Sequence, residues 1–302
     1  MNHQASPPCV ATPLRAVELP SRPLVIRKVL KFIKRHPQIV AGASILLVVA
    51  LIAVFAPVLG TVDPRALSVT KRLRPPSAEF WFGTDALGRD LYSRVVYGAR
   101  ISVSVSISCA FLSCLGGTIV GMISASGRWA DSAVMRVMDG FMSIPSMLLA
   151  IALMAATRGS IGTVIIAITV VEIPRVARVI RGVMLALREM PFVEAAIAAG
   201  STTPKIIIRH LVPAVISPLT VQATYVASAA IIIEASLSFI GAGTPPTIPS
   251  WGNIMADGKA LWQVKPQLVF IPAAFLGLTI LGVNLLGDGL RDALDPRMAE
   301  RS

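Results

Sequence analysis

The sequence is poor in charged residues: Asp, Glu, Lys and Arg make up only 15% of its 302 residues, while 54% are hydrophobic. A soluble domain typically carries about a quarter charged residues. The deficit therefore indicates that lipid surrounds much of the chain. The net charge of +12 would suit a nucleic-acid ligand, but the basic residues are distributed between apolar runs and form no single block, so no nucleic acid is expected as a partner.

Cysteine and histidine are also scarce, with three residues of each. Cys109 and Cys114 lie in one apolar run, the third cysteine lies in a polar tail, and there is neither a disulfide framework nor a C-x-x-C pair. The histidines are widely separated. The sequence therefore predicts no metal site, no catalytic residue and no cofactor bound by this chain.

Six apolar runs approach the length of about 20 residues that a membrane helix needs. They predict an all-α, polytopic membrane protein with six transmembrane helices, over residues 39–59, 101–125, 137–156, 160–173, 213–240 and 268–287. The fourth run is the weakest, because Arg158 and Glu172 crowd it, and we expect it to continue as helix beyond Pro174. No small-residue cleavage site follows the first run, which we interpret as a retained anchor.

Lysine and arginine predict the orientation, because cytoplasmic loops are enriched in both. The expected organisation, from the N-terminus, is a cytoplasmic tail (1–37), a first transmembrane helix (38–60), an external loop (61–100), a core of five transmembrane helices (101–290) and a cytoplasmic tail (291–302). The external loop is an exception to the rule, since it carries seven basic and four acidic residues. We keep the orientation because the other loops agree with it.

The loop between the fourth and fifth runs contains signals for two short helices. The alanine-rich stretch 192–199 is followed by Gly200, which favours the left-handed conformation that ends a helix. A second helix should follow and end at Pro213. Alanines would let a partner surface approach the first helix closely, and Glu194 could accept charge-assisted hydrogen bonds from that partner.

This loop resembles the EAA loop of binding-protein-dependent ABC importer permeases. The matching residues are Glu194, Ala195, Ala196, Gly200 and Pro213. His210 and Val212 stand where the family pattern has Ile and Leu, with the spacing intact. Five other blocks are similar to the "C" type of dipeptide and oligopeptide permeases: residues 83–102, 141–155, 234–243, 249–255 and 284–298.

The resemblance implies a type I ABC importer permease fold, in which the EAA loop (191–213) forms a coupling helix seated on a cytoplasmic ATPase. It implies four partner chains: a second homologous permease subunit, two ATPase subunits that carry ATP and magnesium, and an extracytoplasmic solute-binding protein. The implied function is alternating-access import of di- or oligopeptides, or of similar small solutes, across a bacterial inner membrane. Relatives are known for dipeptides, oligopeptides, nickel chelates, glutathione and opines, and the sequence does not choose among them.

Two other classes of protein fit the sequence less well. An ion-coupled secondary transporter usually shows internal repeats and buried ionisable groups, and few of either are visible here. An intramembrane hydrolase would need a catalytic set at one depth, and none is found. The near-match to a phosphate loop at 83–88 is rejected, because Arg89 replaces its Lys and Asp90 replaces its Ser or Thr.

Charged residues within the apolar runs are candidates for function, since each costs about 2.5–3.5 kcal/mol at the bilayer centre. Glu234 could line the translocation path and meet an ammonium group, or it could bond to the outer loop, and the sequence favours neither. We expect Asp139 to pair with Arg136. Three arginines recur at helical spacing after the fourth run: Arg175, Arg178 and Arg181. They could contact the ATPase or anionic lipid, but we interpret them as interfacial residues.

Two further features concern packing and the outer face. Gly117 and Gly121 form a G-x-x-x-G pattern, which favours close packing of membrane helices. The proline-rich loop 241–265 could receive a solute-binding protein or could serve as a structural lid.

Overall fold

The computed structural model describes residues 35–157 and 159–294, without the side chains of residues 203, 204 and 210. The chain divides into two units, residues 1–36 and 37–302. Only residues 35 and 36 of the first unit are described, and the helices from α2 onward belong to the second unit. The tail expected over 1–37 and most of the tail expected over 291–302 lie outside the described residues.

The described residues form helices and no strand, apart from one isolated bridge between Thr84 and Asp90, which confirms the all-α class. The helices are α2 (Pro37–Val54), η1 (Ala56–Val58), η2 (Val69–Lys71), α3 (Leu91–Ala125), α4 (Arg128–Ser143), α5 (Ser146–Ala155), α6 (Ile161–Arg188), α7 (Pro191–Ala198), α8 (Thr203–Ile206), η3 (Ile207–Leu211), α9 (Val212–Ile240), α10 (Trp251–Gly258) and α11 (Gln267–Leu294). α3 begins well before the expected start of its span, so the preceding loop is shorter than 61–100.

Four of the described helices are long and apolar enough to cross a membrane: α2, α3, α9 and α11. They correspond to the first, second, fifth and sixth expected spans. The third expected span is not one helix, because α4 and α5 meet at an angle of 88° and can count only together as a fifth crossing. Pro145 explains the break, since it lacks an N–H and favours extended backbone at Ile144 (φ −92°, ψ 128°). The expected number of six spans is therefore not confirmed.

α6 corresponds to the fourth expected span and continues as helix past Pro174 to Arg188, as the sequence predicted. It is not among the four helices of spanning composition, because Glu172, Arg175 and Arg178 interrupt its apolar sequence. Its membrane depth must therefore be inferred from the helices against which it packs.

α3 and α6 pack closely and run in the same direction. Gly117 lies against Val176, so that a β-carbon at position 117 would be 2.4 Å from the Val176 Cβ. One turn further along both helices, Gly121 lies against Ile180 in the same way. The prediction that these glycines permit close helix packing is confirmed. α6 therefore lies at the depth of the apolar part of α3.

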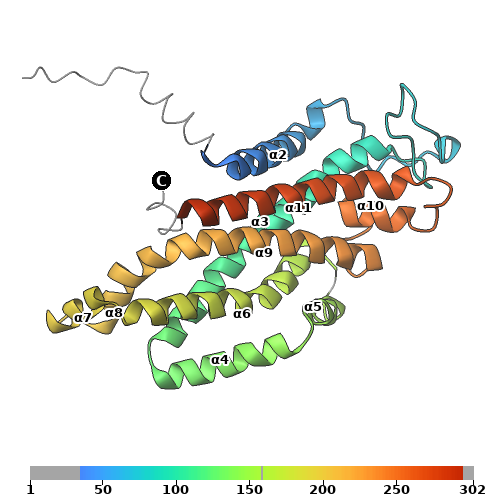
Figure 1. Ribbon diagram of the computed structural model, residues 1–302. Helices are drawn as coiled ribbons and strands as arrows, with labels where there is room; N and C mark the ends of the chain where they lie inside the picture. The colour runs from blue at the N-terminus through green and yellow to red at the C-terminus, as the bar shows by residue number, and fades with distance from the viewer. Residues whose placement is uncertain (1–34, 158, 295–302) are drawn as a thin grey trace, which may run out of the picture. The chain divides into compact units, whose positions relative to one another are not determined.

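Within the second unit, α11 packs against both α2 and α9, and α9 lies alongside α6 (Figure 1). α10 packs on α9, α11 and the beginning of α3, whereas α7 and α8 lie at the opposite ends of α6 and α9. We call these the α10 end and the α7 end. Buried apolar side chains of the described residues form three clusters: one at the α7 end, one where α5 meets α3, α6 and α9, and one around α10.

Candidate functional site

The segment between α6 and α9 contains the short helix and tight turn that the sequence predicted. α7 has Pro191 in its first turn, where the missing N–H costs nothing. At its other end, the N–H of Ser201 donates to the carbonyl oxygen of Ala196 over 3.0 Å. Gly200 between them has φ of +79°, which residues with a β-carbon rarely adopt. A β-carbon there would meet no other atom within 4 Å, so backbone conformation alone explains the glycine.

One buried side chain, Val193, anchors α7 to the rest of the molecule. It belongs to the apolar cluster at the α7 end, which also contains Met184 of α6 and Leu211 of η3. The remainder of α7 is accessible. Of the predicted site residues, Glu194, Ala195 and Gly200 are exposed and Ala196 is half-buried.

The accessible surface of α7 is partly apolar. Phe192 and Ile197 are 45% and 59% exposed, next to the charged Glu194. Large apolar side chains that flank an acidic one on an exposed helix are a surface suited to a protein partner.

The helical stretch after Gly200 does not end at Pro213. α8 leads into a π-helical turn at Ile207–Leu211, in which the N–H of Val212 bonds to the carbonyl oxygen of Ile207, and α9 follows at once. This wider turn accommodates Pro213, which has no N–H to donate and stands in the first turn of α9. The prediction that Pro213 ends a helix is wrong, and α7 is joined to a continuous helical element that includes the fifth expected span.

Glu234 of α9 is fully buried. Its Oε1 accepts a hydrogen bond from Ser238 Oγ (2.9 Å), and its Oε2 accepts one from Ser102 Oγ of α3 (3.2 Å). A carboxylate enclosed in this way is bonded to its neighbours within the chain. The geometry therefore favours a structural role for Glu234, as a hydrogen-bond acceptor within the chain, over a position lining a translocation path.

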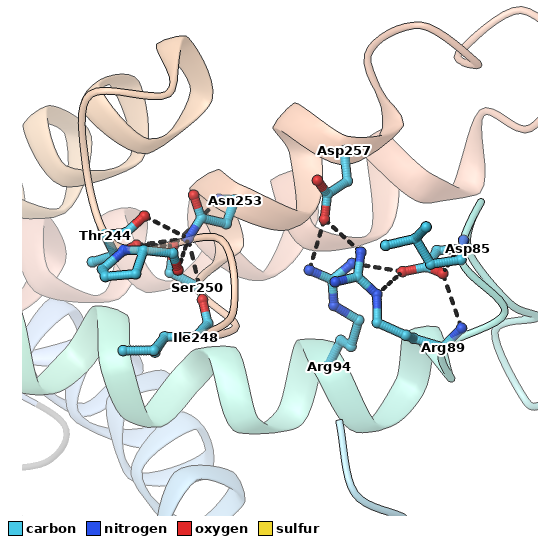
Figure 2. Close-up of polar contacts among 10 residues, drawn as sticks. Asp85, Arg89, Arg94, Thr244, Ile248, Ser250, Asn253 and Asp257 are labelled. Atoms are coloured by element: carbon cyan, nitrogen blue, oxygen red, sulfur yellow. Dashed lines mark hydrogen bonds and ion pairs between the residues drawn. The ribbon is translucent and has the colours of Figure 1, made fainter. Parts of the chain in front are cut away.

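Asn253 of α10 holds the loop that follows α9. Its Nδ2 lies 2.8–3.1 Å from oxygen atoms of three residues in that loop, Thr244, Pro245 and Ile248 (Figure 2). The loop is thus fixed to α10, as the interpretation as a structural lid requires.

An ion cluster joins the loop before α3 to α10 (Figure 2). The Asp85 carboxylate accepts from Arg89 Nε (2.6 Å) and Arg94 Nη1 (2.8 Å). Asp257 of α10 accepts from the same two guanidinium groups, at 2.7 and 2.8 Å. These two arginines were part of the excess positive charge in the expected external loop, and the cluster neutralises them. Sequence reasoning missed it because Asp257 is distant in the chain and no local spacing connects it to Arg94.

A second set of ion pairs joins α4 to α6. Asp139 accepts from Arg178 Nη2 (2.6 Å), and it therefore does not pair with Arg136 as expected. Asp131 accepts from Nε and Nη2 of Arg181. Within α6, Arg175 donates from Nη1 to the buried carboxylate of Glu172 (2.9 Å). All three arginines that were interpreted as interfacial residues thus hold acidic partners.

These features define a multi-pass helical membrane protein with an exposed helix, α7, between two of its long helices. Residues 117–300 match the family described as binding-protein-dependent transport system inner membrane component. The chain belongs to this family. The match favours a binding-protein-dependent system over the ion-coupled secondary transporter considered from the sequence.

Curated relatives and solved structures agree with this placement. The chain is 47% identical to the Sinorhizobium fredii protein named "Probable peptide ABC transporter permease protein y4tQ", over 90% of this chain and 94% of that protein. It is 38% identical to the oligopeptide transport system permease protein OppC of Bacillus subtilis, over 85% of each. A structure of the MetNI methionine ABC transporter matches 68% of this chain and 98% of its own, with a TM-score of 0.55 and 20% identity, which shows a shared fold.

Proposed function

We propose that this chain is a membrane-spanning subunit of an ATP-driven importer of peptides, and that α7 is the surface to which a separate ATPase subunit binds. Peptides are proposed because relatives at 38–47% identity carry peptide and oligopeptide transport in their names. The proposal places the α7 end in the cytoplasm and the α10 end outside. A solute-binding protein would deliver the solute at the α10 end, and a second permease subunit would complete the path.

The observation that carries the proposal is the form of α7. It is an eight-residue helix whose one buried side chain is Val193, and it presents Phe192, Glu194 and Ile197 to a partner. Its buried anchor packs in the cluster that contains side chains of α6 and of the π turn before α9. A partner that moves α7 would therefore act on two long helices at once.

The mechanism that follows is alternating access driven from the α7 end. Closure of the paired ATPases around ATP would displace α7, and α6 and α9 would tilt with it. Because packed cores have discrete arrangements, a small displacement at α7 can switch the opening of the path from one side to the other. This chain would line one side of the path and transmit the movement of α7 to it. The ATPase subunits would carry ATP and magnesium.

Glu194→Arg tests the docking surface. The substitution reverses the charge of an exposed side chain, so the chain should still insert and fold, while the new positive charge should repel the cationic donors of the ATPase that would bind Glu194. We expect at least a tenfold loss of the ATPase subunit retained when the tagged chain is purified from membranes, and a similar loss of ATP-driven peptide uptake. Glu189→Arg is the matched control, because Glu189 is also exposed but lies just before α7. This variant should retain the ATPase subunit and ATP-driven peptide uptake.

Full ATPase retention and uptake by Glu194→Arg would contradict the proposal.

The orientation has its own test: a cysteine at Ser201, in the turn after α7, should react with a membrane-impermeant maleimide in inside-out vesicles and not in intact cells. Reaction from outside the cell would place α7 on the wrong side for an ATPase.

A further inference from the structure

Arg175 lies at a depth where charge is unfavourable in lipid. The stretch between Arg100 of α3 and Arg128, the first residue of α4, contains no charged residue, and its midpoint in the sequence is Cys114 of α3. Ile173 and Val176 of α6 lie against Gly116 and Gly117 of α3. At a rise of 1.5 Å per residue, Arg175 is therefore level with a point about 4 Å from this midpoint and about 12 Å from Ala125, the last residue of α3.

The charged side chains at this depth are exposed in the single chain. The side chains of Arg175 and Arg178 are 51% and 52% exposed, and that of Asp139 on α4 is 60% exposed. Glu172, by contrast, is buried, so the pair that it forms with Arg175 presents the guanidinium group outward. Exposed ionisable groups inside a membrane protein face water-filled cavities or other protein chains, because lipid does not solvate them.

The same face of α6 is closed toward the α10 end. Ile168 and Val164 lie two and three turns before Arg175 on this face, and both are fully buried in the cluster that includes Ala150 and Met154 of α5. The face is thus covered where α5 packs on it and open from Arg175 toward the α7 end. A solute path that is shut toward the α10 end and open toward the α7 end would have this form.

Arg175 retains donors for a ligand. Both oxygens of Glu172 accept from its Nη1 (3.1 and 2.9 Å), so Nε and Nη2 are not used by that pair. Arg178 likewise uses only Nη2 in its bond to Asp139. A planar guanidinium group with free donors at two nitrogens is suited to bind a carboxylate through two hydrogen bonds.

We propose that the exposed face of α6 at Arg175 and Arg178, together with Asp139 of α4, lines the water-filled translocation path and binds the carboxylate group of the transported solute. This inference rests on the proposed function, since it names the chemical class recognised within the path of that importer. It replaces Glu234, which is enclosed by its own chain, as the charged group of the path.

Thiol accessibility tests the environment independently of transport. In a chain whose three cysteines are replaced by alanine, Arg175→Cys should react with a membrane-impermeant maleimide in inside-out vesicles at least ten times faster than Ile119→Cys. Ile119 is the matched control, because it is 50% exposed on α3 at a similar depth but lies on an apolar surface. Equal rates for the two cysteines would overturn the inference.

Uptake of a tripeptide with a free carboxylate by the complete complex tests the ligand. Arg175→Met should lower uptake at least tenfold, whereas Arg175→Lys, which keeps the charge, should lower it less. Arg100→Met makes the same change at an exposed arginine at the outer end of the apolar part of α3 and should have little effect. ATPase retention should be normal in all three variants.

The double variant Glu172→Gln with Arg175→Met separates ligand binding from a structural role. It removes the buried charge that Arg175→Met alone would leave without a partner. Uptake should stay at least tenfold low in this variant, and restored uptake would show that Arg175 only neutralises Glu172. Absence of uptake by the unaltered complex would count against the proposed function itself, whereas normal uptake by Arg175→Met would count against this inference alone.

Discussion

The buried ion cluster at the α10 end makes Asp85→Asn the most informative stability variant. Asp85 is almost fully buried and accepts from two guanidinium groups, those of Arg89 and Arg94, which are buried as well. The substitution leaves two cations facing only Asp257, which is partly exposed. Removing one partner of a buried ion pair costs about 3–5 kcal/mol, because the remaining charge has lost its compensation. We expect a loss of that size in the free energy of unfolding.

The measurement is unfolding of the purified protein in mixed micelles by titration with SDS, followed by tryptophan fluorescence. Trp251 is a suitable reporter, since it is buried on α10 and donates from Nε1 to the carbonyl oxygen of Val95 (3.1 Å). The matched control is Glu79→Gln, which removes the same charge from an exposed pair with Lys71 and should cause no measurable change.

A double variant checks the physical cause. If the cost of Asp85→Asn arises from an uncompensated guanidinium group, then adding Arg94→Met should cost less than the sum of the two single changes. The reasoning is refuted if Asp85→Asn lowers stability by less than about 1 kcal/mol, as expected only for exposed pairs, or if the two changes are additive.

Two further predictions concern glycines. Gly117→Leu should destabilise the protein by about 1–3 kcal/mol in the same titration, because the side chain would overlap Val176, whereas Gly182→Leu, at an open position of α6, should not. Gly200→Ala should cost about 1–2 kcal/mol locally, because φ there is +79°. Hydrogen exchange of the Ser201 amide should then be about tenfold faster, and an unchanged rate would show that the turn does not depend on glycine.

The sequence predicted well those elements that depend on composition alone. α2, α3, α9 and α11 are long runs without interruption, and hydropathy is sufficient to identify them. It placed one helix over the third span, where the structure has two at an angle of 88°, because the run 137–156 is mostly apolar and only Pro145 marks the break. It also ended a helix at Pro213, whereas the π turn before it depends on the packing of buried Ile207 and Leu211, which no local pattern reveals.

The residues of the candidate site also divide into those that the local sequence predicts and those that only the folded structure brings together. The α7 residues could be proposed from the sequence because their spacing is local to one loop. The pairs Asp139–Arg178 and Asp257–Arg94 each join distant segments, so their members could be noticed as charges but not matched to each other. For Glu234 the sequence left two roles open, and only the positions of Ser102 and Ser238 distinguish them.

The structure connects α7, the proposed docking surface, to the charged face of α6 through a short sequence of contacts. Val193 of α7 belongs to the same apolar cluster as Met184 and Ile180 of α6, and Ile180 lies between the two arginines that bind α4, Arg178 and Arg181. A displacement of α7 that moves this cluster must therefore rotate or shift the turns of α6 that carry the α4 pairs. Packed side chains transmit such a shift because they are incompressible on this scale. An ATPase bound at α7 would thus act directly on the turns of α6 next to Arg175, and solute binding there would in turn change the affinity of α7 for the ATPase by the same factor.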